Sequence, residues 1–298
     1  MYDIIIIGAG PAGLTAAIYA RRANKKVLVL EANTYGGQII NSLSVDNYPA
    51  SPHISGFEFA SNLYSQVKDL GAQIKFERVL EINQKKEVKT KNNTYHAKAI
   101  IIATGAENRK LNIEGEEELI GKGVSYCATC DGAFYKNKEV AVVGGGNTAL
   151  EDALYLSDLA SKVYLIHRRE KFRGEEKYVK EIQGKKNIEI IYNSQVKKLN
   201  SKNGLESIEI INNKDEKKEL QVQGLFIAIG RSPENQSFAN LIKLNSEGYI
   251  IAGENCHTSS KGIFVAGDNR VKELRQLVTA TCDGAVAATE AIKYLNKV

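Results

Sequence analysis

The sequence predicts an α/β fold in which parallel strands alternate with helices. Two features support this prediction. The 298-residue chain twice repeats the order apolar strand, glycine-rich turn, helix and second strand. Other short apolar runs end in small residues, as buried strands of parallel sheets do. The length suggests about two domains, and the composition of 43% apolar and 25% charged residues is that of an ordinary globular protein.

The first repeat covers residues 3–31. A strand over residues 4–7 enters a GxGxxG turn and a helix, and the next strand ends at Glu31. The first glycine permits a tight turn, the second lets the backbone approach a pyrophosphate, and the third lets the helix pack close to the strand. The helix N-terminus attracts phosphate, and Glu31 can accept hydrogen bonds from ribose hydroxyls. The candidate residues of this turn are Gly8, Gly10, Pro11, Ala12 and Gly13.

The second repeat covers residues 139–169 and lacks an acid at the end of its second strand. Its turn is formed by Gly144, Gly145, Gly146, Asn147, Thr148 and Ala149, and the basic residues that follow the second strand are His167, Arg168, Arg169 and Arg173. Guanidinium groups bind phosphate in a forked geometry, whereas a carboxylate would repel it. We therefore predict non-covalent FAD at the first site and NADPH at the second. A solvated basic turn is the alternative interpretation of the arginines.

The remaining elements fit the same architecture. A strand over residues 99–102 ends at Ala103, Thr104 and Gly105, and one over residues 263–266 ends at Gly267 and Asp268. Another strand is expected over residues 224–229, and a final helix from about residue 283 to residue 295. Strands interleaved with helices are typical of doubly wound sheets.

A close cysteine pair, Cys127 and Cys130, precedes the strand of the second repeat and is followed directly by Asp131. At this spacing two thiols can close a disulfide and exchange it with a partner through a mixed disulfide. Asp131 is placed to move protons as the thiols form and are consumed. The sequence thus predicts a redox-active pair.

Zinc binding is the main alternative for the pair. Structural zinc requires four ligands, often supplied as two close pairs, but the remaining cysteines, Cys256 and Cys282, are single and far apart. We expect no metal site, and we expect both of these cysteines to be small buried side chains.

Charge and hydropathy exclude other classes of protein. The net charge is +5, but 40 basic and 35 acidic residues are intermixed, and the basic stripe typical of a nucleic-acid-binding protein is missing. No apolar stretch approaches the ~20 residues of a membrane span. The N-terminus enters its first strand at once, so we expect no signal peptide and a cytoplasmic location.

With these motifs in hand, the chain resembles the low-molecular-weight, bacterial-type thioredoxin reductases over essentially its full length. The motifs that carry the resemblance are the two glycine-rich turns, Gly36-Gly37-Gln38, Cys127 to Asp131, the His-Arg-Arg-x-x-x-Arg set, and Gly267-Asp268 with Arg275-Gln276.

The resemblance implies two Rossmann-like dinucleotide-binding domains, with the NADPH domain inserted into a discontinuous FAD domain. The expected limits are residues 1–112 and 240–298 for FAD and 113–239 for NADPH. Further FAD contacts are implied for Gly37, Gln38, Asn47, Gly267, Asp268, Arg275 and Gln276. Cys130 would face the flavin, Cys127 would attack thioredoxin, and the chain would be a homodimer.

Two other functions remain open. A related flavoprotein reductase could act on a glutaredoxin-like or other small thiol partner, or use a different electron donor. A redox sensor could bind FAD without catalysis. The complete arginine set argues against ferredoxin as sole donor, and the cysteine pair argues against a flavin reductase that uses no thiols.

Overall fold

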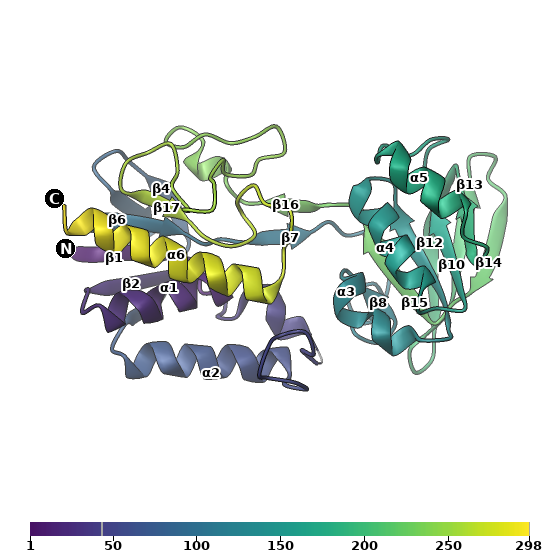
Figure 1. The fold of residues 1–298 in the computed structure, drawn as a ribbon, viewed down its shortest axis with the longest axis horizontal. Helices are drawn as coiled ribbons and strands as arrows, with labels where there is room; N and C mark the ends of the chain where they lie inside the picture. Colours follow the sequence, from purple (N-terminus) through teal and green to yellow (C-terminus); the bar gives the residue numbers. More distant parts are fainter. Residues whose placement is uncertain (43, 298) are drawn as a thin grey trace. The chain divides into compact units, whose positions relative to one another are not determined.

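The computed structural model describes residues 1–42 and 44–297, and these divide into two compact units. Unit 1 comprises Met1–Glu107 and Ser232–Val298, and unit 2 comprises Asn108–Arg231. The chain leaves unit 1 within β7 (Ala106–Asn108) and returns within β16 (Arg231–Pro233). The predicted α/β fold with parallel sheets is confirmed (Figure 1).

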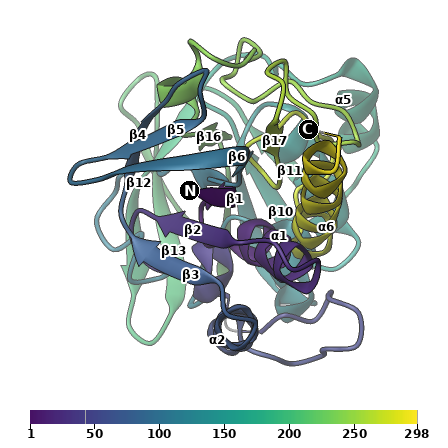
Figure 2. The same cartoon turned by 90° about the vertical axis from the view of Figure 1, so that its left-hand side faces the viewer.

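Unit 1 is built on a sheet in the order β3-β2-β1-β6-β5-β4, with β17 paired to β6. Figure 2 shows β3, β2, β1 and β6 in succession, and their pairing is parallel. The strands are β1 (Tyr2–Ile7), β2 (Val27–Glu31), β3 (Gln73–Phe76), β4 (Val79–Ile82), β5 (Glu87–Thr90), β6 (Thr94–Ile102) and β17 (Ile263–Val265). The helical elements are α1 (Pro11–Arg22), η1 (Gly37–Asn41), α2 (Gly56–Asp69), η3 (Gln236–Phe238) and α6 (Leu277–Leu295).

The apolar strands explain the layers of unit 1. Side chains alternate between the two faces of a strand, so Ile4 and Ile6 contact the α1 and α6 side. Ile5 and Ile7 pack toward β4, β5 and residues 238–250 on the other side. Figure 1 shows α1 and α6 next to one another on their face of the sheet. Strands β1, β2 and β17 and the second half of β6 are therefore buried on both faces, which is why they read as continuous apolar runs.

Unit 2 has a second parallel sheet in the order β11-β10-β9-β15-β8 and an antiparallel sheet in the order β12-β13-β14. The parallel strands are β8 (Val124–Ser125), β9 (Glu139–Gly144), β10 (Lys162–Ile166), β11 (Ile188–Ile191) and β15 (Gly224–Ala228). The antiparallel strands are β12 (Ser194–Ser201), β13 (Leu205–Asn212) and β14 (Lys217–Gln221). The helical elements are α3 (Ala128–Asp131), η2 (Gly132–Tyr135), α4 (Asn147–Ser157) and α5 (Glu176–Gln183).

The same alternation orders unit 2. Val140 and Val142 of β9 pack with α4, whereas Ala141 and Val143 pack against the antiparallel sheet. Each unit thus places a parallel sheet between two covering layers, with the helix that follows its glycine-rich turn on one face.

The last helix begins earlier than the sequence predicts. It starts at Leu277 and not near residue 283, because Gln276 and Thr279 form a reciprocal capping box. The extra turns carry Thr279 and Thr281, whose β-branched side chains lower helix propensity and hide the true start from a local pattern.

No described helix is long and apolar enough to cross a bilayer.

Candidate functional site

The GxGxxG turn of unit 1 leaves open space at its middle glycine. A Cβ on Gly8 would lie 2.3 Å from the Ala103 carbonyl oxygen, and one on Gly13 would lie 1.9 Å from the Gly8 carbonyl oxygen. A Cβ on Gly10 would meet nothing closer than the Gly37 Cα at 3.9 Å. Gly8 and Gly13 are therefore required by the packing of the chain itself, whereas Gly10 keeps room for a ligand.

Several predicted residues gather around this turn at the carboxyl ends of the parallel strands. The Gly36 amide donates to the Ala9 carbonyl (2.8 Å), which brings the Gly36-Gly37 turn beside the first glycine loop. Gly267, after β17, approaches Ala12: a Cβ on it would lie 2.9 Å from the Ala12 Cβ. Ligands of doubly wound sheets bind at this edge.

Glu31 lies at the same edge. Its carboxylate accepts hydrogen bonds from the Ala9 amide (2.7 Å) and the Asn33 amide (2.9 Å). The acid at the end of β2 is therefore held directly beside the glycine loop. No side chain of the described residues caps the start of α1, whose first amides carry partial positive charge. This arrangement of a carboxylate and free amides fits the ribose and pyrophosphate of FAD.

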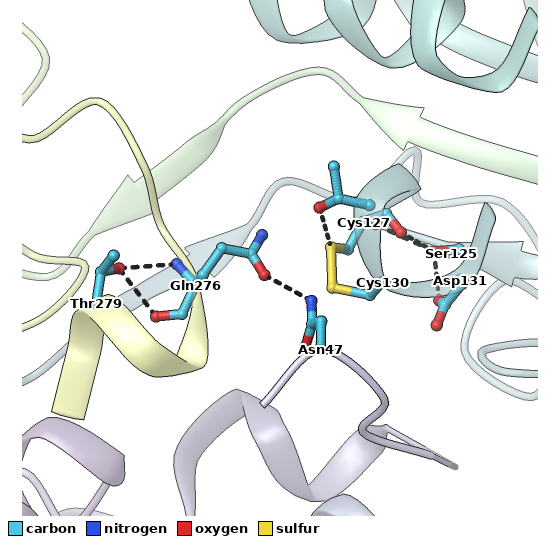
Figure 3. The surroundings of a disulfide bond; sticks show 8 residues. Asn47, Ser125, Cys127, Cys130, Asp131, Gln276 and Thr279 are labelled. Carbon is cyan, nitrogen blue, oxygen red and sulfur yellow. Dashed lines mark hydrogen bonds between the residues drawn. A yellow bond between two sulfur atoms is a disulfide. The ribbon is translucent and has the colours of Figure 1, made fainter. Parts of the chain in front are cut away.

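Other predicted residues form further polar contacts in unit 1. The Asn47 amide nitrogen donates to Gln276 Oε1 at 3.1 Å (Figure 3), although 229 residues separate the two in the chain. Arg275 packs its guanidinium 4.3 Å from the centre of the Tyr249 ring and donates from Nε to the Asp268 carbonyl at 3.3 Å. Thr104 accepts a hydrogen bond from the Asn269 side chain (3.1 Å). Gln38 is exposed in η1.

The turn of unit 2 repeats this geometry. A Cβ on Gly144 would lie 2.3 Å from the Ala228 carbonyl oxygen and 2.5 Å from the Ala149 Cβ, whereas one on Gly146 would meet nothing within 4 Å. Gly146 is followed directly by α4, which no side chain of the described residues caps. Asn147 and Thr148 are exposed in the first turn of that helix. The open position again lies at a helix N-terminus, where phosphate binds.

The basic segment is tied to this turn. The Arg173 amide donates to the Gly145 carbonyl at 2.7 Å, and Asn147 and Glu175 exchange two hydrogen bonds of 2.8 Å each. Arg168, Arg169 and Arg173 are exposed, and their guanidinium groups make no ion pair or hydrogen bond to a described residue. Free guanidinium groups beside a phosphate-type turn fit the 2′-phosphate of NADPH.

His167 has a different position from the arginines. Its side chain is buried, and a Cβ on Gly145 would lie 2.1 Å from its ring. Its Nε2 is 3.0 Å from the Lys171 carbonyl oxygen. Burial lowers the pKa of His167, which favours the neutral ring at neutral pH. The buried His167 ring therefore packs against Gly145 of the glycine-rich turn.

Cys127 and Cys130 form a disulfide with Cα atoms 5.3 Å apart. Cys127 immediately precedes α3, which carries Cys130 and Asp131. The Asp131 amide donates to the Cys127 carbonyl at 3.1 Å. The disulfide that the CxxC spacing predicts is therefore present.

Burial raises the pKa of the Asp131 carboxyl, and a hydrogen bond from the Ser125 hydroxyl (2.6 Å) acts in the opposite direction. A carboxyl group held above its usual pKa is a better proton donor near neutral pH. Sequence reasoning missed Ser125, although its position two residues before the CxxC pair was a possible signal.

The other cysteines differ from one another. Cys256 is buried, and burial raises its pKa to about 12. Cys282 is exposed on α6, so the expectation that it is buried was wrong. Its helix was expected to begin only at residue 283, and the surface of the added turns could not be assigned. No group of three or more His, Cys, Asp or Glu side chains that could hold a metal occurs in the described part of the chain.

Comparison with known proteins agrees with this geometry. The family model described as pyridine nucleotide-disulphide oxidoreductase matches residues 2–284. The thioredoxin reductase of Bacillus subtilis (strain 168) is 42% identical, over 100% of this chain and 96% of the relative. That of Listeria innocua serovar 6a is 43% identical, over 100% and 95%. The crystal structure of thioredoxin reductase from Streptococcus pyogenes MGAS5005 has a TM-score of 0.95 and 39% identity, covering 100% of this chain and 99% of its own. The chain is therefore an oxidoreductase of the pyridine nucleotide-disulphide oxidoreductase family, and within that family it belongs to the thioredoxin reductases.

Proposed function

We propose that this chain is an NADPH-dependent, FAD-containing thioredoxin-disulfide reductase. The observation that carries the proposal is the Cys127–Cys130 disulfide in a chain with two separate glycine-rich nucleotide turns. Relatives named thioredoxin reductase, 42–43% identical over the whole chain, support it.

Unit 1 is the FAD-binding domain and unit 2 the NADPH-binding domain in this proposal. FAD is held without a covalent bond by the turn around Gly10, by Glu31, and by the strand ends at Ala103–Gly105 and Gly267–Asp268. The open position at Gly10 supports this assignment. Gln38, Asn47, Arg275 and Gln276 complete the proposed FAD site.

NADPH binds at the turn around Gly146, with Arg168, Arg169 and Arg173 around the 2′-phosphate. The exposure of the three arginines and the tie of Arg173 to the Gly145 carbonyl support the preference for NADPH over NADH.

When bound, flavin supplies two-electron chemistry between a reduced nicotinamide and a disulfide. The chain's own residues then handle sulfur and protons. Cys127 attacks the thioredoxin disulfide, Cys130 resolves the mixed disulfide, and Asp131 gives and takes protons as the thiols form and are consumed. The chain acts as a homodimer in the cytoplasm.

The decisive experiment has two steps. NADPH is added without oxygen, and the flavin absorbance is followed; bleaching by NADPH and little by NADH is expected. Oxidised thioredoxin is then added in a steady-state assay of NADPH consumption, with a glutaredoxin as the control substrate. An inert flavin would indicate a sensor, and consumption with glutaredoxin alone would indicate a different thiol partner. Light scattering of the purified protein checks the homodimer.

A further inference from the structure

Ser125 lies where β8 ends, two residues before Cys127. It pairs with Phe226 of β15 in the parallel register, and it is only 3% exposed. Figure 3 shows its side chain between the cysteine pair and Asp131. A polar group in this position must find hydrogen-bond partners within the protein.

The Ser125 oxygen has three such partners. The Cys127 amide donates to it at 3.0 Å. Asp131 Oδ2 lies 2.6 Å away and the Cys127 carbonyl oxygen 3.3 Å away, and both are acceptors for the hydroxyl proton. A hydroxyl group has one proton to donate and two lone pairs that accept, so it can serve only one of these two acceptors at a time.

The ionisation state of Asp131 determines whether the Ser125 hydroxyl donates to the Asp131 carboxylate or to the Cys127 carbonyl oxygen. When Asp131 is a carboxylate, the hydroxyl donates to it, because this contact is the shorter and is charge-assisted. When Asp131 is neutral, its own O–H donates to the second lone pair of the Ser125 oxygen. The serine proton can then turn to the Cys127 carbonyl oxygen. The Cys127 amide keeps its acceptor in both states, so every group in the cluster stays satisfied without movement of heavy atoms.

We propose that Ser125 is a positioning residue that holds Asp131 in place beside the redox pair in both of its protonation states, by rotation of a single hydroxyl group. The proposal rests on the proposed function, because it assumes that Asp131 exchanges protons during the reaction. Two electrons from the reduced flavin of the proposed function break the sulfur–sulfur bond and leave two thiolates, which take up two protons to become thiols, one from Asp131 and one from solvent. Asp131 gives one of these protons and becomes the carboxylate to which Ser125 donates.

The pKa shift of Asp131 arises from burial and from the Ser125 hydrogen bond. Tyr135 of η2 is the titratable neighbour that senses Asp131: burial, and then the Asp131 charge, raise the pKa of Tyr135 to about 12, so it stays neutral. Helix α4 packs against α3 and carries two carboxylates, Glu151 and Asp152. Burial, the Glu151 charge and the opposing Arg231 set the pKa of Asp152 at about 7. Ser125 is thus the hydrogen-bonding side chain that tunes Asp131.

The test compares Ser125→Ala with Ser125→Thr, which keeps a hydroxyl, in the flavin-loaded protein. Ser157→Ala is the matched control, because Ser157 is also buried in unit 2 but its hydroxyl donates to the Leu154 carbonyl. The titration of Asp131 is followed by infrared spectroscopy of its carboxylic acid band, which Asp131→Asn identifies. Thioredoxin-dependent turnover is measured over the same pH range.

Ser125→Ala should shift the Asp131 titration to higher pH, because the charge-assisted hydrogen bond to the carboxylate that it removes is stronger than the one made by the neutral acid. Its turnover should fall about tenfold, as expected for a lost hydrogen bond to a charged group. Ser125→Thr and Ser157→Ala should titrate like the unchanged protein. An unshifted Asp131 titration in Ser125→Ala would overturn the proposal. Full turnover of Asp131→Asn would instead refute the proton-transfer role in the proposed function, whatever the serine variants do.

Discussion

Arg270 and Asp283 form a buried, two-point ion pair. Arg270 Nε lies 2.8 Å from Asp283 Oδ2, and Nη2 lies 2.8 Å from Oδ1. Lys272 adds a second cation at 2.9 Å, and the Gly267 amide donates to the same carboxylate at 2.9 Å. The side chains of all three charged residues are at most 6% exposed. Asp283 therefore fastens the turn that follows β17 to helix α6.

Asp283→Asn should destabilise unit 1 strongly. Removing the carboxylate leaves buried Lys272 without this counter-charge and leaves Arg270 with only the exposed Glu254, 3.6 Å away. Breaking a buried ion pair in this way typically costs about 3–5 kcal/mol. Urea unfolding measured by circular dichroism checks this. Glu176→Gln is the control, because it breaks an exposed ion pair in which the Glu176 side chain is 81% exposed and that of Lys180 is 72% exposed. This variant should leave the unfolding transition unchanged. Equal transitions for the two variants would contradict the prediction.

The Asp283 carboxylate should also make the free energy of unfolding depend on pH in the acid range. Burial by itself raises the pKa of Asp283, but the hydrogen bonds from Arg270 and Lys272 outweigh it and hold the pKa below its usual 3.8. Because the folded-state pKa is lower than the unfolded one, the stabilisation is complete above about pH 4 and is lost as the pH falls through the folded value. The urea midpoint should therefore fall in this acid range, and by less in Asp283→Asn.

Gly10→Val should give folded but colourless protein. Gly10 has φ −76°, which any residue can adopt, and its Cβ direction is open, so the side chain would occupy the proposed pyrophosphate position. The flavin absorbance of purified protein and its circular dichroism give the answer. Gly13→Val is the contrasting variant: its Cβ would lie 1.9 Å from a backbone oxygen, and it should fail to fold. Full flavin content in Gly10→Val would refute the assignment of the FAD site.

Arg168→Ala and Arg169→Ala should weaken the use of NADPH specifically. Loss of one charged hydrogen bond to the 2′-phosphate, roughly 1.5–3 kcal/mol, corresponds to about a 10- to 140-fold loss in kcat/KM. NADH lacks this phosphate, so its kcat/KM should hardly change. Stability should also be unchanged, because the two side chains are exposed. An equal loss with both nucleotides would show that these arginines do not read the phosphate.

The two cysteines should differ in trapping. Cys130→Ser keeps the attacking thiol but lacks the resolving one, so it should accumulate a covalent adduct with oxidised thioredoxin, whereas Cys127→Ser should trap little. Flavin reduction by NADPH should persist in both variants, because hydride transfer uses neither sulfur. Gel electrophoresis without reductant separates the adduct. An adduct formed only by the Cys127 variant would reverse the roles.

Local sequence patterns were sufficient for the repeated part of the fold. Each strand–turn–helix unit is specified within about 30 residues, because apolar runs, glycines and helix periodicity act over short distances. The CxxC pair is local in the same sense, and its disulfide is present. The two helices that follow the glycine turns begin directly after Gly10 and Gly146, at Pro11 and Asn147.

Only the tertiary structure decided the contacts that join distant segments. Asn47 meets Gln276, and Arg270 meets Asp283, because the packing of α6 against α1 and the sheet brings their backbones together. The positions of polar residues in the sequence follow no period from which their hydrogen-bond partners could be predicted. Whether two groups form a hydrogen bond depends on differences of a few tenths of an ångström in their separation. For the same reason the sequence predicted a proton-transfer role for Asp131, whereas the hydrogen bond from the buried Ser125 hydroxyl to its carboxylate became visible only in the structure.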